Sequence, residues 1–153
     1  MKELIDYRRK LVERLAEAAG EFCSACEDAD PLALVEGDWT LHQVAAHVRD
    51  IDRAVYNPRA QRTLQEETPL FETVDPDDWM ARNYNRNEPL KNILDEFKSN
   101  VEALCSLLNE MPGQAWARES RHETLGDGLT LQLWVERSLA HIEEHLRAVR
   151  KSN

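Results

Sequence analysis

The chain has 153 residues, of which 42% are hydrophobic and 31% charged, and its net charge at pH 7 is −10. At this length one domain covering residues 1–153 can bury a core without help from disulfides. The negative charge leaves no broad cationic surface for a phosphate backbone, so we expect no nucleic acid as a partner. No apolar run approaches the roughly 18 residues needed to cross a bilayer, so we also expect no membrane partner.

The start of the chain and its cysteines indicate a cytoplasmic protein. Met1-Lys2-Glu3-Leu4 opens directly into a charged amphipathic pattern without a signal-peptide core. Three cysteines, an odd number, fit reduced thiols better than a disulfide framework. We therefore expect a cytoplasmic location and free thiols.

The first half of the chain predicts two long helices. Apolar residues recur at intervals of three and four from Glu3 to about Cys26, which is the helical spacing. A second helix begins at Thr40, because Thr40 can cap it and Gln43, three residues later, completes a capping box. Pro58 is expected to end or bend this helix, although a helical pattern resumes from Gln61 to Gln65.

The second half predicts two more long helices. Residues 66–87 have poor periodicity, apart from a short helix that Asp75 can cap. A long apolar stripe predicts a helix from Glu88 to Glu110, and an irregular connection from Gln114 to Leu129 precedes a last helix from Thr130 to Lys151. Four long amphipathic helices with two extended crossovers predict an all-α four-helix bundle, in which sites are usually built from side chains on facing helices.

The last predicted helix carries two histidines at metal-ligand spacing. His141 and His145 are four residues apart, so their imidazoles stack one turn apart on one face, beside the apolar stripe. His47 keeps helical spacing with Val44 and Ile51 in the second helix and so faces inward. Three neutral imidazoles leave one position of a tetrahedral ion open, as in catalytic zinc sites. The alternative is that they are hydrogen-bonded core histidines.

Four other side chains are candidates for a place around such a site. Asp50 follows His47 by three residues and can orient an imidazole, although a surface salt bridge is an equal alternative. His122 lies in a loop, where it either supplies an extra ligand, lines the pocket or is simply solvated. Trp134 and Ser138 lie on the same strip of the last helix as the two histidines and are expected to line the pocket.

Three further patterns have ordinary explanations. His42 lies about 140° around the second helix from the inward histidine, so we expect it near the surface. Cys23 and Cys26 have the C-x-x-C spacing, but they end a helix and have no second pair, which favours buried thiols. Residues 141–145 match H-x-x-E-H, but only eight residues follow for a third ligand, and Glu144 is expected to point to solvent, away from the ion.

The sequence resembles the DinB/YfiT-like metalloenzyme family over nearly its whole length. The resemblance rests on the second helix, on the approach from Gly126 to Thr130 and on the closing histidine pair. It implies a four-helix bundle in which His47, His141 and His145 bind a divalent metal. Three imidazoles suit zinc, nickel, copper, iron or manganese, of which we expect zinc or nickel. Members of this fold include mycothiol-dependent maleylpyruvate isomerase and bacillithiol S-transferases, which implies a low-molecular-weight thiol as a second cofactor.

Three hypotheses of function follow. The first is a metal-dependent transferase that uses such a thiol as the nucleophile against a small-molecule substrate. The second is a metal-dependent hydrolase using the same open position, and the third is a non-catalytic stress or interaction protein with a structural metal. Broad apolar stripes also favour a homodimer formed through a helix face. An anionic thiol would need cations, for which the crossovers offer Arg82, Arg86, Arg118 and Arg121.

Overall fold

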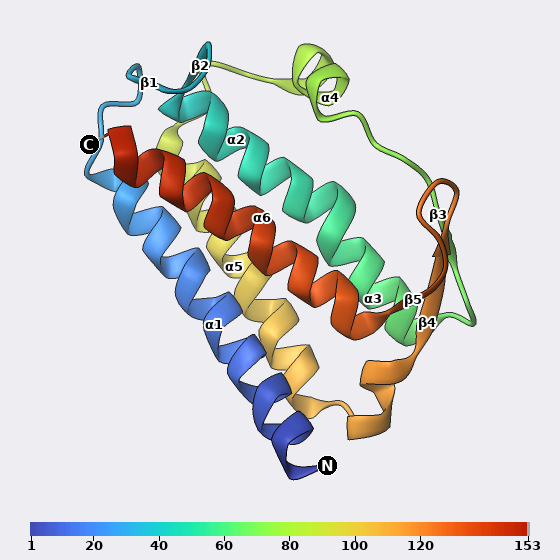
Figure 1. Cartoon of the computed structure of the whole chain (residues 1–153). Coiled ribbons are helices and arrows are strands. Elements are labelled where there is room, and N and C mark those ends of the chain that lie inside the picture. The colour runs from blue at the N-terminus through green and yellow to red at the C-terminus, as the bar shows by residue number, and fades with distance from the viewer. Residues whose placement is uncertain (153) are drawn as a thin grey trace.

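Four long helical segments pack side by side in the computed structural model, which describes residues 1–152 (Figure 1). They are α1 (Lys2–Glu27), the continuous segment of α2 (Leu41–Ile51), η1 (Asp52–Tyr56) and α3 (Asn57–Gln65), then α5 (Leu90–Glu110) and α6 (Leu131–Ser152). The shorter elements are β1 (Leu34–Glu36), β2 (Trp39–Thr40), β3 (Leu70–Phe71), α4 (Pro76–Asn83), η2 (Gly113–Ala117), β4 (Glu119–His122) and β5 (Gly126–Thr130). The predicted all-α four-helix bundle is confirmed.

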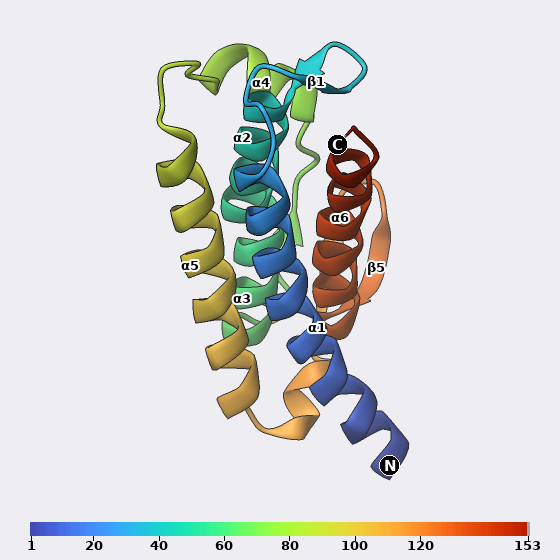
Figure 2. The same ribbon diagram turned by 90° about the vertical axis from the view of Figure 1, so that its left-hand side faces the viewer.

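The helix directions explain the connections. In Figures 1 and 2, α1 and α6 run one way along the bundle, whereas the α2–α3 segment and α5 run the other way. Because α3 and α5 are parallel, residues 66–89 travel back along the outside of the bundle, carrying α4 with them. The connection from 111 to 130 instead begins and ends at the same end of the bundle. No helix within the described residues is both long and apolar enough to cross a membrane.

The inward stripes of the four helical segments form a single core. Residues from all four segments are buried there, among them Leu15, Phe22, Leu41, Phe97 and Ile142. The rings of Phe22 and Phe97 meet edge to face, with 5.7 Å between their centroids. Each fully buried side chain of this size stabilises the fold by about 1.5–3 kcal/mol relative to exposure. The core therefore holds α2 and α6, which carry the histidines, at fixed positions along each other.

Pro58 does not end the second helix, and the helical pattern continues to Gln65, as the sequence allowed. The capping box of Thr40 and Gln43 is present at its start, and the helix then passes Pro58 into α3. Proline has no N–H for the usual bond to the fourth residue before it. Directly before Pro58 the chain widens into a π-helical turn, η1, where the N–H of Asn57 donates to the oxygen of Asp52. This wider turn lets the helix continue.

Short strands organise the connections, which the sequence pattern did not predict. β1 and β2 form an antiparallel hairpin that turns at Gly37, whose φ of +54° favours glycine. β3 pairs in parallel with β4, and β4 pairs antiparallel with β5, so that Phe71 lies opposite His122. The β3–β4 pair ties the two connections together. Asp75 caps α4, as predicted.

Candidate metal centre

Three histidines from two facing helices meet at one point. One ring nitrogen each of His47 on α2 and of His141 and His145 on α6 lies within 4.8 Å of the others. The Nε2 atoms of His47 and His141 are 3.0 Å apart. Two imidazole nitrogens that bind one tetrahedral ion at about 2.0–2.1 Å lie roughly 3.3 Å apart, so this spacing suits a shared ion.

The protonation state of these rings also suits a metal. Burial, and to a smaller extent the neighbouring His145, lower the pKa of His47 to about 4 and that of His141 to about 2. Both rings are therefore neutral at pH 7 and keep a lone pair for a ligand bond. Nδ1 of His47 is buried without a hydrogen-bond partner in residues 1–152. A core histidine kept for its hydrogen bonds would have both nitrogens satisfied.

Glu36 fixes the orientation of His145. Its Oε1 lies 2.5 Å from Nδ1 of His145. An ionised carboxylate only accepts, so the ring hydrogen is on Nδ1 and the lone pair of His145 is on Nε2. Partners of this kind orient metal-binding histidines in proteins. Sequence analysis missed Glu36, although Gly37 between two short apolar runs was a signal for the hairpin that carries it.

A cavity of about 440 Å³ lies beside the histidines and is the right size for a small molecule. All three histidines line it. The remaining lining residues come from the second helical segment, both connections and α6: Ile51, Val55, Tyr56, Arg59, Thr73, Val74, Pro76, His122, Thr124, Leu125 and Glu144. The exposed Glu144 was expected to point away from the ion, but it lines this cavity.

Residues 3–149 match the sequence profile of the DinB superfamily. The chain belongs to the DinB superfamily. Among solved structures it is similar to YfiT from Bacillus subtilis, described as a probable metal-dependent hydrolase with an unusual four-helix bundle topology. The two share 22% sequence identity with a TM-score of 0.84, over 94% of this chain and 84% of that chain, which shows a common fold. A search of curated proteins found no match.

Asp50 does not orient an imidazole in this DinB protein. Its Oδ1 accepts from Nε of Arg49 at 2.8 Å and from Arg53 at 3.3 Å, and its Oδ2 accepts from Nε1 of Trp79 at 3.2 Å. These donors, two of them on its own helical segment, occupy the carboxylate. The role that sequence analysis offered to Asp50 belongs to Glu36.

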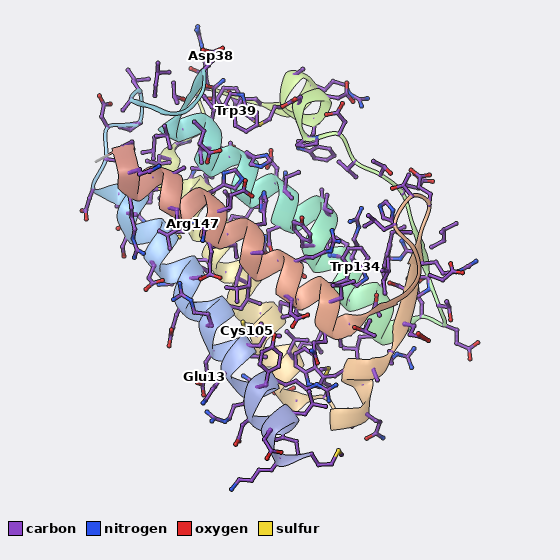
Figure 3. All side chains as sticks on the ribbon, in the orientation of Figure 1. Glu13, Asp38, Trp39, Cys105, Trp134 and Arg147 are labelled. Atoms are coloured by element: carbon purple, nitrogen blue, oxygen red, sulfur yellow. The ribbon has the colours of Figure 1, made fainter. Side chains whose placement is uncertain are left out.

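Of the other predicted residues, only His122 reaches the cavity. It does not belong to the cluster of three histidines, and its Nδ1 accepts the backbone N–H groups of Thr124 and Leu125. Trp134 is fully buried at the start of α6 and donates to Oγ of Ser120 (Figure 3). Ser138 is buried as well, and neither of these two residues lines the cavity.

His42 is buried, whereas sequence analysis placed it near the surface. Only 7% of it is exposed, since the residues that lead into α5 cover the first turn of α2. Nδ1 of His42 lies 2.6 Å from the hydroxyl of Tyr84, and Nε2 lies 2.7 Å from the backbone oxygen of Glu88. The ring is a satisfied core histidine.

The chain offers no thiol to the cavity. Cys23, Cys26 and Cys105 are all free and buried, as expected. Burial raises the pKa of Cys23 and Cys26 to about 12 and that of Cys105 to about 11, which leaves them protonated. The arginines expected to serve an anionic thiol are not among the lining residues either; Arg59 on α3 is there instead.

Proposed function

We propose that this protein is a metal-dependent hydrolase of a small molecule, and that His47, His141 and His145 bind its divalent ion, zinc or nickel. The supporting observation is a cluster of three imidazoles opening onto a cavity that also holds a carboxylate and a phenol. A divalent ion bound there supplies Lewis acidity, which lowers the pKa of a water or thiol beside it. The description of YfiT as a probable metal-dependent hydrolase supports hydrolysis over transfer.

The chain's own side chains would share the proton transfers. Glu144 is the one carboxylate among the lining residues and can take the proton of an attacking water. Burial raises the pKa of Tyr56, so its hydroxyl keeps its proton at pH 7 and can donate to the leaving group. Glu36 holds His145 in the tautomer that an ion needs.

Metal content and hydrolysis test this proposal together. Tag-free wild type, His47→Ala, His145→Ala and Glu144→Gln would be analysed by elemental mass spectrometry, before and after addition of zinc or nickel. We expect about one ion per chain in wild type and in Glu144→Gln, and almost none in the two histidine variants. His42→Ala is the control, because that ring lies outside the cluster.

The same proteins would then be assayed on a panel of nitrophenyl esters, anilides and phosphates. Removing a general base typically costs 10²–10⁴-fold in rate, so Glu144→Gln should lose at least about 100-fold with its metal in place. A wild type that holds no ion after addition, or a Glu144→Gln variant of full activity, would contradict the proposal.

Thiol transfer remains the second candidate, because a cavity of about 440 Å³ has room for a thiol as well as an acceptor. Since the chain's own thiols are buried, the thiol would have to be added from outside. Turnover that requires a thiol and consumes it one for one with the electrophile would favour transfer. Turnover with water alone would favour hydrolysis.

A further inference from the structure

Two arginines of the second helical segment are buried, but only one has a counter-ion. Arg49 is 6% exposed and contacts three carboxylates, those of Asp50, Glu88 and Glu96. Arg59 is 9% exposed and has no carboxylate within 4.0 Å among residues 1–152. Burying a guanidinium without an anion is costly, so its surroundings are incomplete as they stand.

The packing of Arg59 fixes its guanidinium at the cavity wall. The group lies 4.8 Å from the ring centre of Trp134 and 5.8 Å from that of Phe71. Its Nη2 donates to the backbone oxygen of Glu72 at 2.8 Å. Within the described residues, Nε and Nη1 make no hydrogen bond. The guanidinium of Arg59 is therefore fixed at the cavity wall, and its Nε and Nη1 donors are free to bind a ligand.

His122 adds a second donor at the same place. Thr124 and Leu125 each donate a backbone N–H to its Nδ1 at 3.1 Å, so in the neutral ring the hydrogen is on Nε2. Burial and the charge of Arg59 lower the pKa of His122, which keeps the ring neutral. Nε2 lies 3.4 Å from Nη2 of Arg59. Two donors thus stand side by side, and an anion between them would accept from both.

We propose that Arg59 and Nε2–H of His122 bind a carboxylate of the substrate, so that the substrate is a small organic acid with an apolar body. A carboxylate is favoured over a phosphate because Arg59 is the one lysine or arginine among the lining residues, while Glu144 lines the same cavity and would repel a dianion. Ile51, Val55, Val74 and Leu125 supply apolar walls for the body. This inference rests on the proposed function for what happens at the histidines, but the anion site itself does not require a metal.

A pair of probes matched in shape tests the site: 3-phenylpropionate and its uncharged amide. Their dissociation constants would be measured by NMR titration of backbone amides, on metal-free and on zinc-loaded protein. We expect the acid to bind at least tenfold more tightly than the amide in both forms. The shifts should centre on Thr73, Thr124 and Leu125.

Variants locate the effect. A hydrogen bond to a charged group contributes about 1.5–3 kcal/mol to binding. Arg59→Gln should therefore weaken the binding of the acid by about tenfold to a hundredfold and leave the affinity for the amide unchanged. Arg59→Lys should fall between the two. Arg62→Gln is the matched control: it removes the same charge one turn further along α3, where Arg62 pairs with Glu66 outside the cavity, and should change neither affinity.

Equal binding of acid and amide by wild type, or an unchanged acid affinity in Arg59→Gln, would overturn the inference. If Arg59→Gln does not fold, the acid–amide comparison in wild type and the Arg59→Lys variant still decide it. Because the metal-free titration does not depend on an ion at His47, His141 and His145, a failed metal site leaves this result standing. A failed anion site likewise leaves the metal result standing.

Discussion

His42 and His47 lie five residues apart on α2 and are almost equally buried, with 7% and 6% of each exposed, but their surroundings are opposite. Both ring nitrogens of His42 have protein partners, whereas Nδ1 of His47 has none among residues 1–152 and its Nε2 lies against another imidazole. Arg49 and Arg59 repeat this contrast further along the segment. The first region, around His42 and Arg49, is complete within the protein. The second, around His47 and Arg59, is incomplete, because polar atoms there have no partner in the described residues. Burial alone therefore does not distinguish the two kinds of polar residue.

The largest difference in unfolding free energy should be the one between variants of Arg49 and Arg59. Arg49→Met leaves Asp50 and Glu88 without their main partner, and breaking a buried ion pair on one side costs about 3–5 kcal/mol. Arg59→Met keeps the apolar stem and leaves no carboxylate without its partner. Its free energy of unfolding should therefore fall by about 1 kcal/mol or less. Urea unfolding of the two metal-free variants measures both values, and equal losses would break the comparison.

The two histidine variants should differ in how much free energy of unfolding they lose. His42→Leu leaves the Tyr84 hydroxyl and the Glu88 carbonyl without a partner and should cost about 2–3 kcal/mol. His47→Leu should change metal-free stability by less than about 1 kcal/mol, because the ring makes few hydrogen bonds.

The same two variants should also differ in how far zinc raises their melting temperature. Ligand that binds only the folded state raises its stability, so excess zinc should raise the melting temperature of wild type and His42→Leu but not of His47→Leu. Thermal unfolding with and without zinc measures this. A zinc-dependent shift that survives in His47→Leu would place the ion elsewhere.

Glu36 sharpens the comparison, since it reaches the incomplete region from a distant hairpin. Glu36→Ala releases Nδ1 of His145 and should weaken zinc binding by about 10–100-fold, measured by competition with a chelator. Asp38→Ala removes the same charge from the same hairpin, where Asp38 is exposed (Figure 3), and should change zinc affinity by less than about twofold. Equal losses in both variants would mean that only net charge matters.

Asp52 lies between His47 and Arg59 in the sequence, and its effect on stability depends on pH. Neither of its buried oxygens has a hydrogen-bond partner in the described residues, and burial raises its pKa to about 7. The unfolded chain loses this proton above about pH 4 while the folded chain keeps it to about pH 7, so stability falls as pH rises through this window.

Asp52→Asn removes that pH dependence. Between pH 4 and pH 8 the stability of the variant relative to wild type should rise by a few kcal/mol, because each unit of the pKa shift is worth about 1.4 kcal/mol. The gain should grow from pH 4 to pH 7 and then level off, as measured by urea unfolding at each pH. A gain that is the same at pH 4 and pH 8 would show that Asp52 is not the titrating group.

The bundle and its histidines were predictable because both depend on local spacing. Helical periodicity identified the four segments, and the four-residue interval of His141 and His145 placed two rings together. Glu36 was not predictable in this way, because it meets His145 across 109 residues of sequence. Strands of two or three residues, such as β2 and β3, are too short to show a period.

Arg59 was overlooked for a different reason. The cations for an anionic thiol were sought in the two connections, whereas Arg59 lies on the helix that continues past Pro58. For Asp50 the sequence left an imidazole and a salt bridge as equal alternatives, and the structure pairs it with Arg49 and Arg53. Sequence spacing shows which side chains share a face, but not which partner each one takes.

The π-helical turn at η1 has a consequence for comparing sequences. An α-helix turns about 100° per residue, so one extra residue in a turn rotates everything after it by that amount. The turn therefore acts as a one-residue insertion that sets the frame of α3 and brings Arg59, rather than a neighbour, to the cavity. Removing one residue between 52 and 56 would shift that frame while leaving His47 in place. An alignment with a protein that lacks this turn needs a one-residue gap here to compare equivalent positions of α3.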